Sequence, residues 1–573
     1  MRLSRLYFLL PLSLLVLGYF HHITAYNQDL GRHLKTGEII LKTFHVPSTN
    51  LFSYTYPDFP FINHHWGAEV LFFITHALLG DPGLFSLSLI VIGTACSIVF
   101  YQAQKKATII PLIITSLLYL RVLFERTDLR PELLSFLFLS LMITILYHNR
   151  EKATKLIFLL PVIELLWANT HIYFPIGILV LLLFLIDAGI TERKNLVNIH
   201  TKTLLGIFLV TGLMALINPH FITGALYPLR VFQNYGYTIE ENQTPFFLQS
   251  LGFHKPSFLY LELAVILLFS SLFISIKRSR PIDWLLSVTF TIIALSAVRN
   301  FPLFVFATFI PRSLAFSDIF EPILKKIKTK PPILFMSLIT CIVLLYVWQS
   351  RTVLSLTTFG YGVDNGAKNA LDFVERNHVK GPMFNNFDIG SYIEARLYPQ
   401  ERVFIDGRPE AYPASFIQNT YIKMQQDPVL FAKISEQYHF NTIIFSHTDQ
   451  TPWADAFTPS IIRNPDWIPI YLDQMMLILV KNTPENQALI KKYGMNLETY
   501  SSPLPTSERE LRQLAHFYAV ANLPQQLEGA LLKLNSINPT DCSVLGNLAQ
   551  LYTQQNNPSS QIYISRYQMN CLR

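Results

Sequence analysis

The residues best suited to chemistry occur in a short polar run, residues 29–38, directly after the first apolar segment. The run contains the carboxylate of Asp29 and the cations Arg32, His33 and Lys35. A carboxylate beside a membrane helix can accept a proton or bind a metal ion, and neighbouring cations can hold a phosphate. An ordinary solvated loop at the membrane interface is the alternative interpretation of the same residues.

A second polar group lies in the turn 125–132, where Arg126, Asp128 and Arg130 occur between two apolar segments. Charges at the edge of a membrane are costly unless they are paired or face a cavity. Structural pairing of arginines with carboxylates would therefore also explain this turn. Other polar residues are expected on the same side of the membrane: His171, Asn218, His220, Glu240, Glu241 and Arg299.

A third group consists of His64, His65 and Glu69. Since His65 and Glu69 are four residues apart, they share one face of a helix. Imidazole and carboxylate groups at this spacing suit a divalent metal ion. A belt of Trp and His residues at the membrane interface explains them equally well, and the sequence lacks a clear acidic metal triad, so the need for a metal cofactor stays open.

Composition predicts that lipid surrounds much of the chain. Of the 573 residues 51% are hydrophobic and only 14% are charged, which is too apolar for a soluble enzyme. The formal charge of +7 could suggest a nucleic-acid partner. No basic stretch carries interleaved aromatic residues, however, so nucleic-acid binding is excluded.

The apolar segments predict about eleven membrane-spanning helices, since a span needs about 20 apolar residues. The shorter apolar stretch 67–80 is interpreted as a helix on the membrane surface. Lys and Arg then collect in every second loop, which places the N-terminus in the cytoplasm. The predicted spans are 5–22, 83–102, 107–122, 131–148, 155–169, 172–189, 202–217, 257–276, 281–298, 301–318 and 331–349.

Beyond the last predicted span the sequence resembles a globular domain on the non-cytoplasmic side. Residues 364–485 predict a small α/β unit with a helix at Leu371–His378. No glycine-rich loop opens a helix there, so a nucleotide site is not supported. Four short strands are predicted: Pro382–Phe384, Arg402–Ile405, Thr442–Phe445 and Met476–Val480.

The C-terminal residues repeat at a spacing of 34, because Leu514 and Tyr518 match Leu548 and Tyr552. This pattern resembles two tetratricopeptide-type helical hairpins, which we expect to pack on the α/β unit. The start of one helix would then approach the end of the next. A disulfide between Cys542 and Cys571 is therefore predicted.

Together these patterns predict a mainly α membrane protein with three parts. Residues 1–350 form the transmembrane domain, with a first outer loop at 23–82. Residues 351–490 form a periplasmic α/β domain, and residues 505–573 form the helical hairpins.

Residues 1–350 resemble the C-type (GT-C) membrane glycosyltransferase superfamily, through Asp29 in the run Asp29…His33-Leu34-x-x-Gly37, the apolar interfacial helix and the second acid Asp128. The run from Pro47 to Glu69 and the string Phe404-Ile405-Asp406-Gly407-Arg408-Pro409-Glu410 resemble an uncharacterised bacterial branch. The Trp-Trp-Asp string of oligosaccharyltransferases is absent, which disfavours peptide N-glycosylation. Turn chemistry also explains the Asp406 string.

The resemblance implies inverting transfer of a sugar from a polyprenyl-phosphate-linked donor, at the bacterial inner membrane, to an acceptor outside the cytoplasm. It assigns Asp29 as general base or metal ligand and Asp128 as the supporting acid. By their charge rather than by a motif, five cations and one histidine are candidates for the lipid phosphate: Arg32, His33, Lys35, Arg126, Arg130 and Arg299.

Two other functions remain open. A non-catalytic scaffold would use the α/β domain and the repeats to bind a periplasmic protein partner. A transporter of lipid-linked sugar should carry ionisable residues near mid-membrane, whereas here the charges gather at one face. The transporter therefore ranks last.

Overall fold

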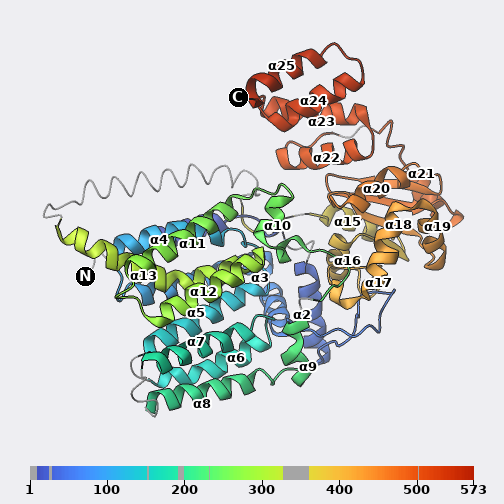
Figure 1. Cartoon of the computed structure of the whole chain (residues 1–573). Helices are drawn as coiled ribbons and strands as arrows, with labels where there is room; N and C mark the ends of the chain where they lie inside the picture. The colour runs from blue at the N-terminus through green and yellow to red at the C-terminus, as the bar shows by residue number, and fades with distance from the viewer. Residues whose placement is uncertain are drawn as a thin grey trace.

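The computed structural model describes residues 9–24, 29–150, 154–191, 199–230, 233–326, 360–364, 366–500 and 503–572. Figure 1 shows a bundle of long helices, a mixed α/β domain beside one end of it, and a C-terminal group of helices packed on the α/β domain. The predicted span 331–349 lies outside the described residues.

The bundle is built from apolar helices whose inner faces carry large aromatic and aliphatic side chains, such as Phe136, Phe304 and Phe306, all fully buried. Its helices are α1 (Leu9–Tyr19), α3 (Trp66–Ala103), α4 (Ile109–Leu123), α5 (Glu132–Asn149), α6 (Leu160–Ala168), α7 (Pro175–Thr191), α8 (Ile199–Met214), α11 (Pro256–Ile274), α12 (Pro281–Ser296) and α13 (Phe301–Lys326).

Four of the described helices are long and apolar enough to cross a membrane, and the prediction of eleven spans is not supported. The four are Trp66–Ala103, Glu132–Asn149, Pro256–Ile274 and Val298–Pro322. Other segments that we predicted as spans form apolar helices of 10–17 residues, shorter than a span requires. These are Ile109–Leu123, Pro175–Thr191, Thr201–Met214 and Pro281–Ser296.

Helix α3 joins two segments that the sequence separated, the predicted surface helix 67–80 and the predicted span 83–102. Its backbone is interrupted at Gly80, whose φ of 64° lies in the left-handed region, and Pro82 lies two residues further on. The two predicted segments are thus distinct helical pieces. That the first piece lies on the membrane surface stays a prediction.

Short helices gather at the end of the bundle that faces the α/β domain (Figure 1). They come from the loops that carry most of the polar candidates. They are α2 (Gly31–Thr43), α9 (Phe221–Leu226), η4 (Tyr227–Arg230), η5 (Glu240–Asn242), α10 (Pro245–Ser250) and η6 (Val298–Asn300), while η3 (Lys155–Leu159) precedes α6.

The α/β domain contains a four-stranded mixed sheet in the order β1-β2-β4-β3. Strands β1 (Met383–Asn385) and β2 (Thr442–Ser446) are parallel, and β4 (Met476–Lys481) pairs antiparallel with β2 and with β3 (Trp467–Leu472). Its helices are α15 (Lys368–Arg376), η7 (Phe387–Ile389), α16 (Gly390–Leu397), η8 (Pro409–Ala411), α17 (Ala414–Phe416), η9 (Ile417–Ile422), α18 (Lys423–Gln426), α19 (Pro428–Gln437), α20 (Pro452–Ile461), η10 (Pro484–Asn486) and α21 (Gln487–Tyr493).

Three of the four predicted strands are present, but Arg402–Ile405 is not a strand of this sheet. Val403 instead forms an isolated parallel bridge with Ser53 of the first outer loop. Strand β3 was missed, and it contains Pro469 and a register shift between Pro469 and Tyr471, so its sequence does not alternate regularly.

The C-terminal residues form two antiparallel helical hairpins, α22 (Glu508–Val520) with α23 (Pro524–Ile537) and α24 (Cys542–Gln554) with α25 (Ser560–Cys571). They pack on the α/β domain, where Arg463 donates a hydrogen bond of 2.9 Å to the carbonyl of Ala521. The predicted disulfide is confirmed, with the Cα atoms of Cys542 and Cys571 5.6 Å apart. Their assignment as tetratricopeptide repeats stays a prediction.

Candidate functional site

Asp29 lies just before α2, at the end of the bundle beside the α/β domain. Its two carboxylate oxygens face different arginines, Arg130 at 3.3 Å and Arg32 at 3.7 Å. The side chain remains 23% exposed, whereas Arg32 is buried. The structure thus brings together the first polar run and the turn 125–132, and it leaves the carboxylate accessible to a substrate.

Two arginines of the turn 125–132 share a carboxylate from a third loop. Glu241 of η5 forms ion pairs with Arg126 and, at 3.2 Å, with Arg130. Burial raises the pKa of Glu241, but Arg130, Arg126 and Arg299 lower it more strongly, so the net pKa lies well below its usual range. The arginine pairing considered for this turn is therefore present, with a partner about 110 residues away in the sequence.

The charged cluster continues onto η6 and α5. Arg126 also donates to Glu132 at 2.6 Å, and Arg299 lies 3.7 Å from the same carboxylate. Arg299 donates to Asn242 at 2.9 Å and lies over the ring of Tyr173. Three of the predicted phosphate-binding arginines therefore lie in one cluster near Asp29.

Asp128 has a different environment from Asp29. Its carboxylate accepts hydrogen bonds from the backbone N–H of Thr24 at 3.1 Å and from the Thr24 hydroxyl at 3.0 Å. Thr24 lies five residues before Asp29 in the sequence. Asp128 thus holds the chain that leads to Asp29, and both acids lie at the same end of the bundle, as the sequence predicted.

The two remaining basic residues of the polar run, His33 and Lys35, contact other partners. His33 contacts the buried carboxylate of Glu69 at 2.9 Å, and Arg32 lies 3.6 Å from the same group. Burial and Arg32 lower the pKa of His33. Lys35 pairs with Glu38 at 3.0 Å, in the same helix. In this structure Lys35 is therefore engaged away from the arginine cluster.

Four histidine rings form a contiguous cluster near Glu69. The ring of His65 lies 5.4 Å from that of His33, 4.1 Å from that of His64 and 5.2 Å from that of His171. Burial lowers the pKa of His64 to about 4 and that of His65 well below its usual value. Burial therefore favours the neutral form of His64 and His65.

The predicted metal ligands His64, His65 and Glu69 do not assemble as a ligand set. Glu69 is occupied by His33 and by Asn63, which donates to it at 2.6 Å. Within the described part of the chain, no group of three or more His, Cys, Asp or Glu residues is arranged to hold a metal ion. The donors present thus do not fit a metal ion in this conformation.

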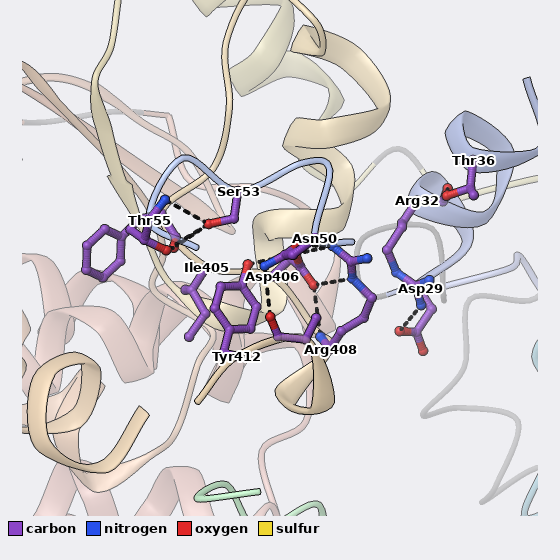
Figure 2. A network of polar contacts seen from close by, with 12 residues as sticks. Asp29, Arg32, Thr36, Asn50, Ser53, Thr55, Ile405, Asp406, Arg408 and Tyr412 are labelled. Carbon is purple, nitrogen blue, oxygen red and sulfur yellow. Dashed lines mark hydrogen bonds and ion pairs between the residues drawn. The ribbon is translucent and has the colours of Figure 1, made fainter. Parts of the chain in front are cut away.

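A second polar network surrounds Asp406, which is fully buried (Figure 2). Arg408 forms an ion pair with it at 2.7 Å and donates to Asn50 of the first outer loop, also at 2.7 Å. The Tyr412 hydroxyl donates to Asp406 at 2.8 Å. The Asn50 amide returns a hydrogen bond to the carbonyl of Ala411 at 3.0 Å.

This network fastens the first outer loop to the α/β domain. Further along the loop, the Tyr54 hydroxyl donates to the carbonyl of Met383 at 2.7 Å, and Thr55 donates to that of Phe404 at 2.9 Å. Arg408 also lies over the ring of Phe61. The string around Asp406 thus connects the first outer loop to the α/β domain. The interpretation of this string as a simple turn did not include that connection.

Sequence reasoning gave no role to two residues that organise these networks. Glu241 was recognised only as an outer polar residue, although it joins Arg126 to Arg130. Asn50 lies within the run 47–69 that carried the family resemblance, yet nothing in its neighbours indicated a buried partner 358 residues away.

No family model and no curated protein matches the chain. Several solved structures, however, are similar to the chain. The archaeal oligosaccharyltransferase AglB from Archaeoglobus fulgidus, in complex with an inhibitory peptide and a dolichol-phosphate, aligns with a TM-score of 0.54 and 13% identity over 95% of this chain and 86% of that chain. The apo form of the Archaeoglobus fulgidus oligosaccharyltransferase aligns at 0.53 and 12% identity over 93% and 82%.

A third structure, of the same oligosaccharyltransferase tethered to an acceptor peptide, aligns at 0.52 and 11% identity over 81% of this chain and 71% of that chain. The likeness includes the bundle and extends into the C-terminal part. At this identity it shows a shared fold.

Proposed function

We propose that the protein is a membrane glycosyltransferase of the GT-C type, which transfers a sugar from a polyprenyl-phosphate-linked donor to an acceptor outside the cytoplasm. The proposal includes insertion in a bacterial inner membrane, with the N-terminus in the cytoplasm and the C-terminal domains in the periplasm. The observation that carries it is the partly exposed Asp29 carboxylate beside the arginine cluster, on a fold shared with oligosaccharyltransferases.

In the proposed reaction, Asp29 accepts the proton of the acceptor nucleophile, which then attacks the anomeric carbon on the face opposite the leaving phosphate. This displacement inverts the configuration of that carbon. Arg126, Arg130 and Arg299 neutralise the charge that develops on the phosphate. Asp128 acts as a positioning residue through its two hydrogen bonds to Thr24.

The test compares the Asp29→Asn variant with the wild type in two measurements. Mass spectrometry of the lipids that purify with the protein detects the bound donor, and the loss of sugar from that donor over time gives the rate of transfer. We expect the variant to retain polyprenyl-phosphate-linked sugar and to transfer it more slowly by a factor on the order of 10²–10⁴, since general base catalysis contributes that much. Asp58, exposed in the same loop, provides the matched control as Asp58→Asn. Unimpaired transfer by Asp29→Asn would remove the catalytic assignment.

A second candidate is a membrane-anchored scaffold that binds a protein partner. It is favoured by the outermost helix α25, which buries none of its residues and exposes Ile562 and Met569. Terminal repeats usually need a polar outer face for solubility, so apolar residues exposed there favour a partner that covers them. Loss of a bound partner in an Ile562→Ser, Met569→Ser double variant, with transfer absent from the wild type, would favour this candidate.

A further inference from the structure

Glu241 occupies the position where the proposed function requires a phosphate. Its carboxylate contacts both Arg126 and Arg130, and these are two of the cations assigned to the leaving group. The side chain is 22% exposed, so solvent and ligands can reach it. A carboxylate and a phosphate bind an arginine pair through the same charge-assisted hydrogen bonds.

Glu241 offsets part of the positive charge of the arginine cluster. Arg126, Arg130 and Arg299 face two further acids, since Glu132 pairs with Arg126 and Arg299, and Asp29 pairs with Arg130. Removing Glu241 alone would take one negative charge out of a largely buried cluster, which is unfavourable. An incoming phosphate would replace the charge of Glu241 without leaving the arginines unpaired.

The residues on either side of Glu241 are fixed by contacts that do not involve its carboxylate. Glu240 pairs with Lys255 at 2.8 Å, and Asn242 accepts a hydrogen bond from Arg299. Tyr237, earlier in the same loop, stacks on Phe387 of the α/β domain with the ring centroids 4.2 Å apart. The Glu241 side chain can therefore rotate away while the loop keeps its position.

We propose that Glu241 is a displaceable plug in a phosphate subsite formed by Arg126 and Arg130, and that the donor phosphate expels it on binding. This inference rests on the proposed function. The Glu241 carboxylate competes with the ligand for the two arginines. The apparent affinity for phosphate is therefore the intrinsic affinity multiplied by the fraction of molecules in which Glu241 has left the arginines. The device would keep the arginines paired and the site closed until a donor arrives.

The test measures binding of farnesyl phosphate, and in parallel of inorganic phosphate, to the full chain in detergent. The Glu241→Gln variant removes the competing charge, and we expect it to bind farnesyl phosphate about tenfold or more tightly than the wild type. The matched control, Glu240→Gln, changes the neighbouring acid that pairs with Lys255, and should bind as the wild type does. Arg130→Gln should abolish the gain when combined with Glu241→Gln.

The possible results distinguish a failure of the Glu241 proposal from a failure of the proposed function. Equal or weaker binding by Glu241→Gln, with clear binding by the wild type, overturns the plug and leaves the phosphate site intact. No binding by the wild type or any variant overturns the site itself, and with it the proposed donor. Tightening for farnesyl phosphate alone identifies a lipid ligand, and equal tightening for inorganic phosphate identifies a phosphate site without lipid selectivity. Should Glu241→Gln not fold, the shorter acid in Glu241→Asp must still bind more tightly than the wild type.

Discussion

Asp29 and Asp406 each follow an apolar segment and precede an arginine, yet their surroundings differ. Asp29 is 23% exposed and its nearest ion-pair distances are 3.3 and 3.7 Å. Asp406 is fully buried, and Arg408 and Tyr412 donate to it at 2.7–2.8 Å. Asp29 is thus open to solvent, whereas any reaction at Asp406 would first have to break the contact between the first outer loop and the α/β domain.

A third acid, Asp388 of η7, provides a prediction on pH. Burial, then the neighbouring Asp449 and Asp29, raise the pKa of Asp388 to about 7. The folded state thus binds the Asp388 proton more tightly than the unfolded state does. Its contribution to stability is fully present below the unfolded pKa of 3.8 and is lost as the pH rises to about 7.

We therefore expect Asp388→Asn to flatten the pH dependence of thermal unfolding between pH 4 and 8, and to raise the unfolding temperature relative to the wild type at the upper end. The measurement is the unfolding temperature of the full chain in detergent across that range. The exposed Asp466 supplies a control as Asp466→Asn, which should keep the wild-type slope. A steeper slope in Asp388→Asn would contradict the assignment.

For individual residues, the sequence predicted which side chains lie together only where the partners are close along the chain. Arg126, Asp128 and Arg130 could be grouped because one turn carries them. The contacts of Glu241 with Arg130 and of Asn50 with Arg408 join residues 111 and 358 positions apart. Local composition contains no signal for such a pair, so the roles of Glu241 and Asn50 could not be predicted.

Among the elements, the bounds of two apolar helices were predicted closely, although the number of spans was not supported. The apolar runs that became α5 and α11 need no partner to satisfy their backbone, and their bounds lie within a few residues of those expected. The segment 402–405 is extended, but its backbone partner is the first outer loop, where Val403 donates to the carbonyl of Phe52 at 3.1 Å. Whether an extended segment forms a strand depends on the segment that pairs with it, and here the pairing segment is far away in the sequence.

The hairpin of α24 and α25 provides a prediction at the scale of an element. Its disulfide links residues 29 positions apart, and closing such a loop stabilises a fold by about 2–4 kcal/mol. We expect Cys542→Ser to loosen α25, which has no buried residues of its own, while α22 and α23 stay protected. Amide hydrogen exchange of the two hairpins measures this difference.

The wild type should also show no mass shift at these two cysteines on alkylation without reductant. Cys96, within α3, is a free thiol and acts as the internal control once the protein is denatured. Two alkylated thiols at 542 and 571 in the unreduced protein would contradict the pairing.

Considered as a whole, the molecule has no clean division between its C-terminal parts. A single apolar core contains Phe404 of the α/β domain, Phe517 and Leu548 of the hairpins, and Phe61 of the first outer loop. The sequence predicted three consecutive parts, and it predicted correctly that the hairpins pack on the α/β domain. It could not show that the outer loop supplies part of their interior.

The packing of the first outer loop into the C-terminal core has a consequence for the biogenesis of the protein. During synthesis residues 47–61 emerge some 350 positions before Arg408, so the C-terminal half completes its core on a peptide that is already anchored in the membrane. A fragment of residues 360–572 made alone would lack the Asn50 acceptor, and losing a hydrogen bond to a charged group costs roughly 1.5–3 kcal/mol. We expect this fragment to be poorly folded by circular dichroism and to be rescued in trans by a synthetic peptide of residues 47–63, but not by the same peptide carrying Asn50→Leu. The membrane half would then act as an intramolecular chaperone for the domain it presents.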